Sequence, residues 1–331
     1  MIPFKRANIL LPKNIDMTKW SVVACDQYTS EMDYWNEVEK IVGASPSTLR
    51  ITLPEIFLED SDVNERINKI NDTMKEYLDE DLFYELKDSM IYLERTQADG
   101  RVREGLMGMV DLEDYSYEKG SQTLIRATEK TVIERIPPRL KVRENALLEL
   151  PHIMILIDDE KKKIIEDLKN EVTNSDVVYD FDLMENGGHI KGYKLNNDSM
   201  TKVEEGLEAL CDKEYFEKKY NVKDKGILLF AMGDGNHSLA TAKANYENLK
   251  KTMTPDEYLN HPSRYALVEL VNLHSEALEF EPIHRVIFDT DVNKLIEELY
   301  KYYDINEEGN GQYFELVTKD IDKKLYISNP K

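Results

Sequence analysis

The stretch Ile227-Leu-Leu-Phe-Ala-Met-Gly-Asp-Gly-Asn-His-Ser-Leu-Ala-Thr-Ala-Lys-Ala-Asn-Tyr246 combines an apolar run, a glycine turn and a helix-compatible pattern. The apolar residues from Ile227 to Met232 predict a buried strand, and the pattern from His237 to about Leu249 favours a helix. Between them lies the segment Gly233-Asp234-Gly235-Asn236. A strand, a glycine turn and a helix start together present backbone N–H groups to an anion. The stretch therefore predicts a phosphate-binding turn.

Four polar side chains, Asp234, Asn236, His237 and Ser238, accompany this turn. In the functional interpretation, Asp234 binds Mg²⁺ or orients a nucleophile, and His237 transfers a proton. In the structural interpretation, Asp234 or Asn236 caps the helix, and His237 bonds a nearby backbone carbonyl. Both interpretations predict the same strand, turn and helix.

Strand and helix patterns alternate irregularly along the rest of the chain. Turn signals at Asp99-Gly100 and at Asn186-Gly187-Gly188 predict two hairpins. The remaining expected strands are 153–157, 265–272 and a hairpin over 313–328, and the expected helices are 61–80, 161–172, 201–210 and 292–303. This order predicts an α+β fold with mixed sheets, hairpins and packed helices rather than a doubly wound parallel sheet.

Length and composition limit the class of protein. A chain of 331 residues favours two intimately packed subdomains, and the polar stretch 113–123 is either a boundary between them or a mobile loop. The net charge of −22 disfavours general nucleic-acid and anionic-membrane binding, because phosphates are repelled over most of the surface. Two cysteines form no disulfide framework, and no window approaches the ~20 apolar residues of a membrane span. We therefore expect a cytoplasmic protein.

Three further segments carry candidate chemistry. Asp26 follows the apolar run Val-Val-Ala-Cys, at the end of an expected strand, where a carboxylate is well placed for catalysis. Residues 125–143 concentrate positive charge in an otherwise acidic chain, and arginine forks match phosphate oxygens. Arg285 follows Glu281-Pro282 and is a further candidate for phosphate contact. The alternatives are a turn aspartate, a solvated charged helix and a surface ion pair.

These motifs resemble the DUF1015 family over nearly the whole chain. The Gly-Asp-Gly-Asn-His segment resembles the family's Asp-Gly-His-His-Arg motif. Further resemblance lies in the following segments: Trp20–Tyr28, Gly105–Leu112, Ile125–Glu129 with Glu134–Arg139, Tyr265–Val271 and Pro282–Arg285. Asn236 and Ser238 stand where most relatives have His and Arg, which removes a positive charge. Relatives usually continue for several more elements, so a C-terminal segment of the family pattern is expected to be missing from this single DUF1015-like unit.

DUF1015 in turn resembles the free-serine kinase, ParB and sulfiredoxin-like superfamily, which implies a nucleotide-binding core. The resemblance implies a kinase that transfers a phosphoryl group from ATP, or from ADP or another donor, to a hydroxyl, with free L-serine as acceptor and Mg²⁺ as cofactor. The alternative is a nucleotide-binding regulatory switch, and a weaker third option is a phosphatase or hydrolase using the same acidic residues and a metal. The expected catalytic residues are Asp26, Glu129, Asp234 and His237; the expected nucleotide-binding residues are Arg126, Arg135, Gly233, Gly235, Asn236, Ser238 and Arg285; and the expected metal ligand is Asp234.

Overall fold

The computed structural model describes residues 2–129, 131, 133, 136–150, 153–279, 284 and 286–328. The chain divides into two compact units, Met1–Glu279 and Phe280–Lys331. The stretch 113–123, expected as a boundary, lies inside the first unit, and the division falls at residues 279 and 280.

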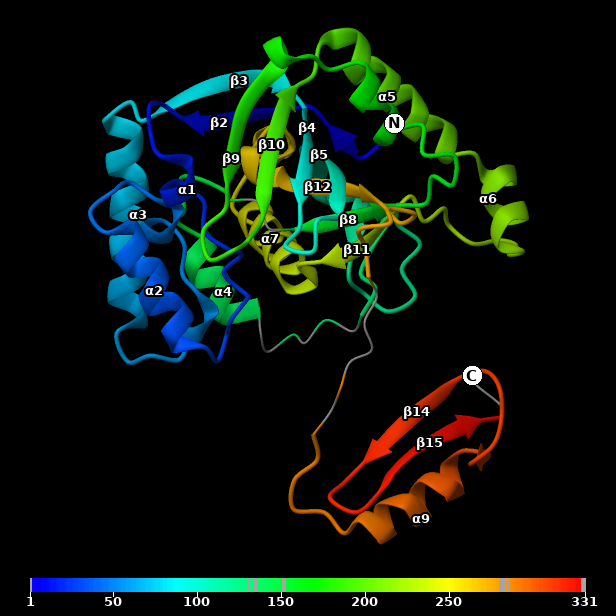
Figure 1. Cartoon of the computed structure of the whole chain (residues 1–331). Coiled ribbons are helices and arrows are strands. Elements are labelled where there is room, and N and C mark those ends of the chain that lie inside the picture. The colour runs from blue at the N-terminus through cyan, green and yellow to red at the C-terminus, as the bar shows by residue number, and fades with distance from the viewer. Residues whose placement is uncertain are drawn as a thin grey trace. The chain divides into compact units, whose positions relative to one another are not determined.

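The first unit is organised around a ten-stranded mixed sheet with the order β6-β7-β11-β8-β12-β5-β4-β10-β9, in which β1 pairs with β5 (Figure 1). The pairs β6–β7, β7–β11 and β8–β12 are parallel, and the other pairs are antiparallel. The strands are β1 (Phe4–Lys5), β4 (Ile91–Thr96), β5 (Val102–Asp111), β6 (Tyr115–Ser116), β7 (Ile125–Arg126), β8 (Met154–Ile157), β9 (Val177–Asp182), β10 (His189–Lys194), β11 (Phe230–Asp234) and β12 (Tyr265–Asn272). The mixed sheet with packed helices agrees with the predicted fold class.

Both expected hairpins are present. β4 and β5 pair from Ile91↔Met107 to Thr96↔Val102, around a turn in which Gly100 has a φ of 87°. β9 and β10 are joined around Asn186 and Gly188, which have φ values of 56° and 88°. Gly and Asn adopt such left-handed conformations more readily than other residues, so local turn chemistry sets the register of both hairpins.

Helices cover the sheet, and β2 (Ala7–Pro12) with β3 (Phe83–Ser89) forms a separate two-stranded sheet. The α-helices of the unit are α1 (Met17–Trp20), α2 (Met32–Val42), α3 (Val63–Asp79), α4 (Ile136–Arg143), α5 (Asn197–Leu210), α6 (Lys213–Tyr220), α7 (Asn236–Lys250) and α8 (Pro255–Leu259). The short 3₁₀ helices are η1 (Thr48–Arg50), η2 (Glu55–Phe57), η3 (Leu112–Asp114), η5 (Glu166–Asn170), η6 (Asn174–Asp176) and η7 (Pro262–Arg264). None of the helices in the described part of the chain is long and apolar enough to cross a membrane.

The helix expected over 161–172 is wrong, because the described structure there is the short η5. The carboxylate of Asp159 accepts hydrogen bonds from the backbone N–H groups of Lys163 at 2.6 Å and Ile164 at 2.9 Å. An aspartate that captures backbone donors in this way competes with helix formation. The segment therefore folds as a turn that leads into a 3₁₀ helix.

The hydrophobic core lies on both faces of the sheet. On one face, buried side chains of the strands pack with α5 and α7, including Tyr92, Ile155 and Leu239. On the other face, Ile91, Leu93 and Met107 pack against β2 and β3, and a separate cluster around Trp20 and Ile67 joins α1 to α3. Both faces of the sheet are therefore covered.

The second unit contains α9 (Val292–Tyr302) and a three-stranded sheet. Its strands are β13 (Ile305–Asn306), β14 (Tyr313–Val317) and β15 (Asp322–Ile327), in the order β13-β15-β14. The carboxylate of Asp291 caps α9, and Leu325 is buried. The expected helix 292–303 and hairpin 313–328 agree with this arrangement.

Candidate functional site

The predicted strand, turn and helix around Asp234 are confirmed. β11 ends at Asp234, Gly235 has a φ of 80°, and α7 begins at Asn236. Gly235 has no side chain to cap the helix, and a Cβ atom there would lie 3.1 Å from the Cα of Ile153. The strand begins at Phe230, three residues later than the apolar run suggests. The turn thus leads into the start of a 15-residue helix without a side-chain cap, and helix N-termini in general favour anions.

Asp234 lies at the exposed edge of this turn. One of its oxygens, Oδ1, accepts a hydrogen bond from the N–H of Gly235 at 2.7 Å, and the side chain is solvent-exposed. Gly233 beside it is also exposed, whereas Gly235 is buried. Mg²⁺ usually keeps several waters and binds one or two carboxylates plus substrate phosphates, so a single exposed carboxylate has the chemistry of a Mg²⁺ ligand.

A second loop is joined to the turn. β7 pairs in parallel with β11, so the loops that follow the two strands leave the same edge of the sheet. The Thr128 hydroxyl donates to the carbonyl of Met232 at 2.9 Å, and the Thr128 N–H donates to Oδ1 of Asn236 at 3.3 Å. Asn236 is only 8% exposed, and its side chain acts here by positioning the two loops. Glu129 follows Thr128 directly and is exposed.

His237 and Ser238 lie in the first turn of α7, and both side chains are half-buried. The carbonyl of His237 accepts a hydrogen bond from the Thr241 hydroxyl at 2.7 Å, which belongs to the regular helix. The expected site residues Asp234, Asn236, His237 and Ser238 are thus neighbours through local chain geometry, and Asn236 among them is buried. Glu129 joins them through the loop that Thr128 anchors.

Asp26 lies in a loop that is connected to the same region through α4. The Arg139 side chain of α4 forms an ion pair with Glu55, and the N–H of Glu55 donates to the carbonyl of Cys25 at 2.8 Å. α4 packs against α7. Burial raises the pKa of the Cys25 thiol to about 12, with further contributions from the charges of Asp26 and Glu55. These contacts place the Cys25-Asp26 segment beside the helix that packs on α7.

The chain after Asp26 adopts an uncommon conformation. Tyr28 has a φ of 51°, and its ring stacks on that of Tyr34 with centroids 3.8 Å apart. The Trp35 indole N–H donates to the Tyr28 carbonyl at 3.1 Å. A bulky residue held in the left-handed region stores strain and occurs preferentially at functional sites. The loop is therefore a candidate wall of the site.

Arg126 points to a different part of the sheet. Its guanidinium donates to the carbonyls of Thr123 at 2.7 Å and Gly226 at 2.5 Å, and burial lowers its pKa. These carbonyls precede β7 and β11, whereas the turn at Asp234 follows β11. The arginine therefore ties together the starts of the two parallel strands in this structure. Its assignment to phosphate stays a prediction, and Arg135 and Arg285 lie outside the described residues.

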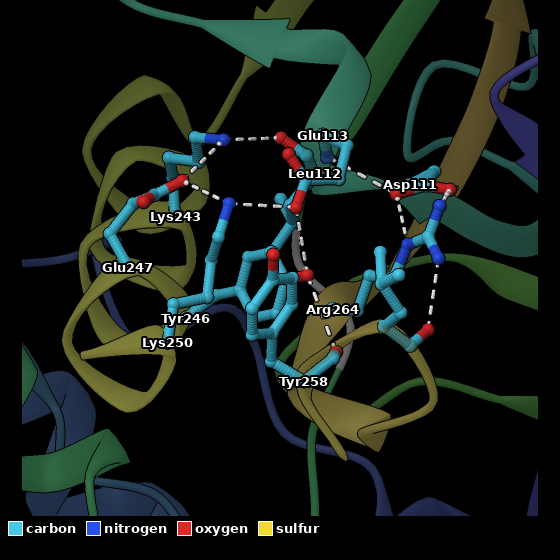
Figure 2. A network of polar contacts seen from close by, with 10 residues as sticks. Asp111, Leu112, Glu113, Lys243, Tyr246, Glu247, Lys250, Tyr258 and Arg264 are labelled. Carbon is cyan, nitrogen blue, oxygen red and sulfur yellow. Dashed lines mark hydrogen bonds and ion pairs between the residues drawn. The ribbon is translucent and has the colours of Figure 1, made fainter. Parts of the chain in front are cut away.

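The C-terminal half of α7 is anchored by a polar network (Figure 2). Glu113 accepts hydrogen bonds from the Tyr246 hydroxyl at 2.9 Å and from the Lys250 ammonium at 2.8 Å. The Lys243 ammonium donates to the carbonyl of Leu112 at 2.8 Å. These contacts fix the helix on the chain that follows β5, and they thereby fix the direction in which its N-terminus points.

Sequence reasoning missed a cluster at the opposite edge of the sheet. Asp158, Glu160 and His274 place one ligand atom each within 4.8 Å of one another. Asp158 follows β8 and His274 follows β12, so the ends of two neighbouring parallel strands bring them together. The Lys219 ammonium lies 2.9 Å from Asp158 and 3.1 Å from Glu160 and already supplies a cation. The sequence signal was the carboxylate pair directly after the strand 153–157.

We expect Gly235→Ala to weaken anion binding at the turn. A non-glycine residue at a φ of 80° is strained, and the added methyl group meets the backbone of Ile153. The cost is about 1–2 kcal/mol, part of which is relieved by shifting the turn. Thermal melting and calorimetric titration of ATP measure the two effects. Gly100→Ala is a matched control, because it has the same left-handed strain but open space around its Cβ. Equal ATP affinity in the Gly235→Ala protein would contradict a role for this turn.

Comparison with known proteins gives one match. No curated protein and no solved structure matches this chain. The family model described as "Protein of unknown function (DUF1015)" matches residues 2–330. The chain therefore belongs to the DUF1015 family.

Proposed function

We propose that this protein is a Mg²⁺-dependent phosphotransferase that moves a phosphoryl group from ATP to the hydroxyl of a small molecule, with free L-serine as acceptor. The observation that carries the proposal is the turn at Asp234, where an uncapped helix N-terminus, an exposed carboxylate and the Thr128 loop meet at one sheet edge. We further propose that this region is the nucleotide-binding core of a ParB/sulfiredoxin-like domain. We also propose that the protein works in the cytoplasm.

The residues divide into groups by the chemistry they provide. Phosphoryl transfer requires positioning and charge neutralisation more than covalent chemistry. The backbone N–H groups of the turn from Gly233 to Ser238 bind phosphate oxygens, and Asp234 holds Mg²⁺ or the acceptor hydroxyl. Asp26 or Glu129 accepts the proton of the hydroxyl, and His237 is a second proton-transfer group. Mg²⁺, when bound, neutralises phosphate charge.

A specific observation favours a second candidate, a nucleotide-binding switch with little transferase activity. By the family resemblance, Asn236 and Ser238 stand where His and Arg are expected, and the Asn236 side chain accepts a hydrogen bond from the Thr128 N–H. The turn therefore offers less positive charge to a transferred phosphoryl group. Incubation with ATP, Mg²⁺ and L-serine separates the two candidates. Phosphoserine formation supports the kinase, and tight nucleotide binding without any phosphorylated product supports the switch.

We expect ATP to bind at least about tenfold more tightly with Mg²⁺ than with EDTA. The nucleotide is a tetra-anion, and the protein has a net charge of −22, so binding without metal meets repulsion from the whole surface. Calorimetric titration of ATP with Mg²⁺, with EDTA and across a salt series measures the difference. Moderate salt reduces the affinity less than for a basic protein, because it also screens the global repulsion. Equal affinity in Mg²⁺ and EDTA would remove the metal and favour binding by arginines and backbone N–H groups alone.

A further inference from the structure

Two arginines stand directly opposite each other on the sheet face that packs against β2 and β3. Arg95 of β4 pairs in register with Arg103 of β5. Residues that face each other across antiparallel strands project to the same side, and like charges in such a pair are destabilising. Two positive charges at this position therefore need a compensating partner.

One carboxylate compensates only one of them. Glu269 of β12 accepts hydrogen bonds from Arg103, with Oε1 at 3.0 Å from Nε and Oε2 at 2.9 Å from Nη2. The side chains of Arg103 and Glu269 are 14% and 16% exposed. Gly105 makes room for this pair, because a Cβ atom there would lie 2.4 Å from the Glu269 carboxylate. The three side chains together carry a net charge of +1 in a half-buried place.

Arg95 is the uncompensated member. Its Nη2 donates to the carbonyl of Gly187 at 2.9 Å, and its buried Nε has no hydrogen-bond partner in the described part of the chain. Burial, followed by the charge of Arg103, lowers the pKa of Arg95. An unpaired guanidinium that is partly buried costs free energy. Such a cost is typical of a group kept for a ligand.

The arginines lie apart from the turn at Asp234. Arg95 is in phase with Ile91 and Leu93 on β4, on the sheet face that packs against β2 and β3, whereas α7 packs on the other face. β8, β12 and β5 separate β11 from β4, so Arg95 lies four strand spacings from β11, which corresponds to about 19 Å. A subsite at these arginines is therefore separate from the turn.

We propose that Arg95 and Arg103 bind the carboxylate of a small molecule, with Glu269 beside them to receive an ammonium group. The Nη1 groups of both arginines make no hydrogen bonds to any described residue, so a carboxylate can bridge them. A monoanion matches the net charge of +1, whereas a phosphate dianion is repelled by Glu269. The subsite lies apart from the turn at Asp234, so its binding does not rest on the proposed function.

Direct binding tests the subsite without nucleotide. Calorimetric titration uses L-serine, which has a carboxylate and an ammonium, L-lactate, which lacks the ammonium, serinol, which lacks the carboxylate, and inorganic phosphate. We expect L-serine to bind most tightly, L-lactate more weakly, and serinol at least about tenfold more weakly than L-serine. Equal affinity for L-serine and serinol, preference for phosphate, or no binding by any probe would overturn the carboxylate assignment.

The decisive variant is Arg95→Gln, which keeps a donor for Gly187 and removes the charge. We expect it to bind L-serine about tenfold or more weakly, to bind Mg²⁺–ATP as before, and to melt at the same or a higher temperature, because repulsion with Arg103 is relieved. Arg101→Gln, an exposed arginine of the same hairpin, is the control and leaves binding unchanged. Unchanged L-serine affinity together with a lower melting temperature would show that Arg95 only holds the hairpin.

The two proposals fail separately. If the protein binds L-serine through Arg95 but forms no phosphoserine, the result supports the subsite and contradicts the proposed kinase activity. If the protein phosphorylates serinol as well as L-serine, and Arg95→Gln does not change L-serine affinity, the result supports the kinase activity and contradicts the subsite. Arg103→Gln is a poorer test, because it leaves the half-buried Glu269 without its partner and destabilises the fold.

Discussion

Asp234→Asn should reduce phosphoryl transfer by about 100-fold or more while the protein melts at its original temperature. The side chain is exposed, so the change opens no cavity and leaves no buried group unpaired. Asparagine keeps the oxygen that accepts the Gly235 N–H, so the turn retains its geometry. The negative charge that holds the metal or the acceptor hydroxyl is lost. Steady-state assay of phosphoserine formation, with thermal melting beside it, measures both quantities.

A matched variant separates a local effect from a change in net charge. Asp256→Asn in the first turn of α8 removes one exposed carboxylate near a helix start in the same unit. It should leave transfer and nucleotide binding unchanged. If Asp234→Asn and Asp256→Asn are equally active in phosphoryl transfer, Asp234 contributes only to the structure of the turn. Titration with Mg²⁺–ATP adds a further readout, because loss of transfer with retained nucleotide binding points to the acceptor side of the reaction.

The parts of the fold set by short-range chemistry were predictable. The turn at Asp234 follows from two glycines behind an apolar run, and the β9–β10 hairpin follows from Asn186 and its glycines. α2 was missed although Trp35, Val38 and Val42 are buried at helical spacing, so its signal was present in the sequence. The error over 161–172 arose from Asp159, whose side-chain capture of backbone N–H groups is not visible in a hydrophobic pattern.

The candidate site was predictable where it is local and unpredictable where it depends on tertiary contacts. Residues 234–238 are neighbours in the chain, so one motif identified them. Thr128 and Asn236 are 108 positions apart, and their contact follows only from the parallel pairing of β7 and β11. The basic stretch suggested Arg126 as a phosphate ligand, but its guanidinium donates hydrogen bonds to two backbone carbonyls in this structure. The Arg103–Glu269 pair, 166 positions apart, had no signal in one sequence.

The largest loss of stability is expected from Asp111→Asn, at the end of β5 (Figure 2). The carboxylate is 3% exposed and accepts two hydrogen bonds from Arg264, at 2.9 Å and 2.7 Å, and one from Lys5 at 3.2 Å. Removing one partner of a buried ion pair costs about 3–5 kcal/mol. Arg264 and Lys5 are partly exposed, so about 3 kcal/mol is expected in denaturant unfolding at pH 7. Asp99→Asn, at an exposed pair with Arg101, should cause no measurable change.

The same loss should depend on pH in a defined direction. Burial raises the pKa of Asp111, but hydrogen bonds from Arg264, the Glu113 N–H and Lys5 outweigh it and hold the pKa below its ordinary value. A lowered pKa in the folded state gives stability that is present above the unfolded pKa of about 3.9 and is lost as pH falls through the folded value. The free-energy difference between wild type and Asp111→Asn should therefore be constant from pH 7 to pH 5 and shrink below about pH 4. If the free-energy difference stays constant to acid pH, the asparagine amide destabilises the protein through its hydrogen-bonding geometry and not through the lost charge. A difference absent already at pH 7 would mean that Arg264 and Lys5 do not rely on this carboxylate.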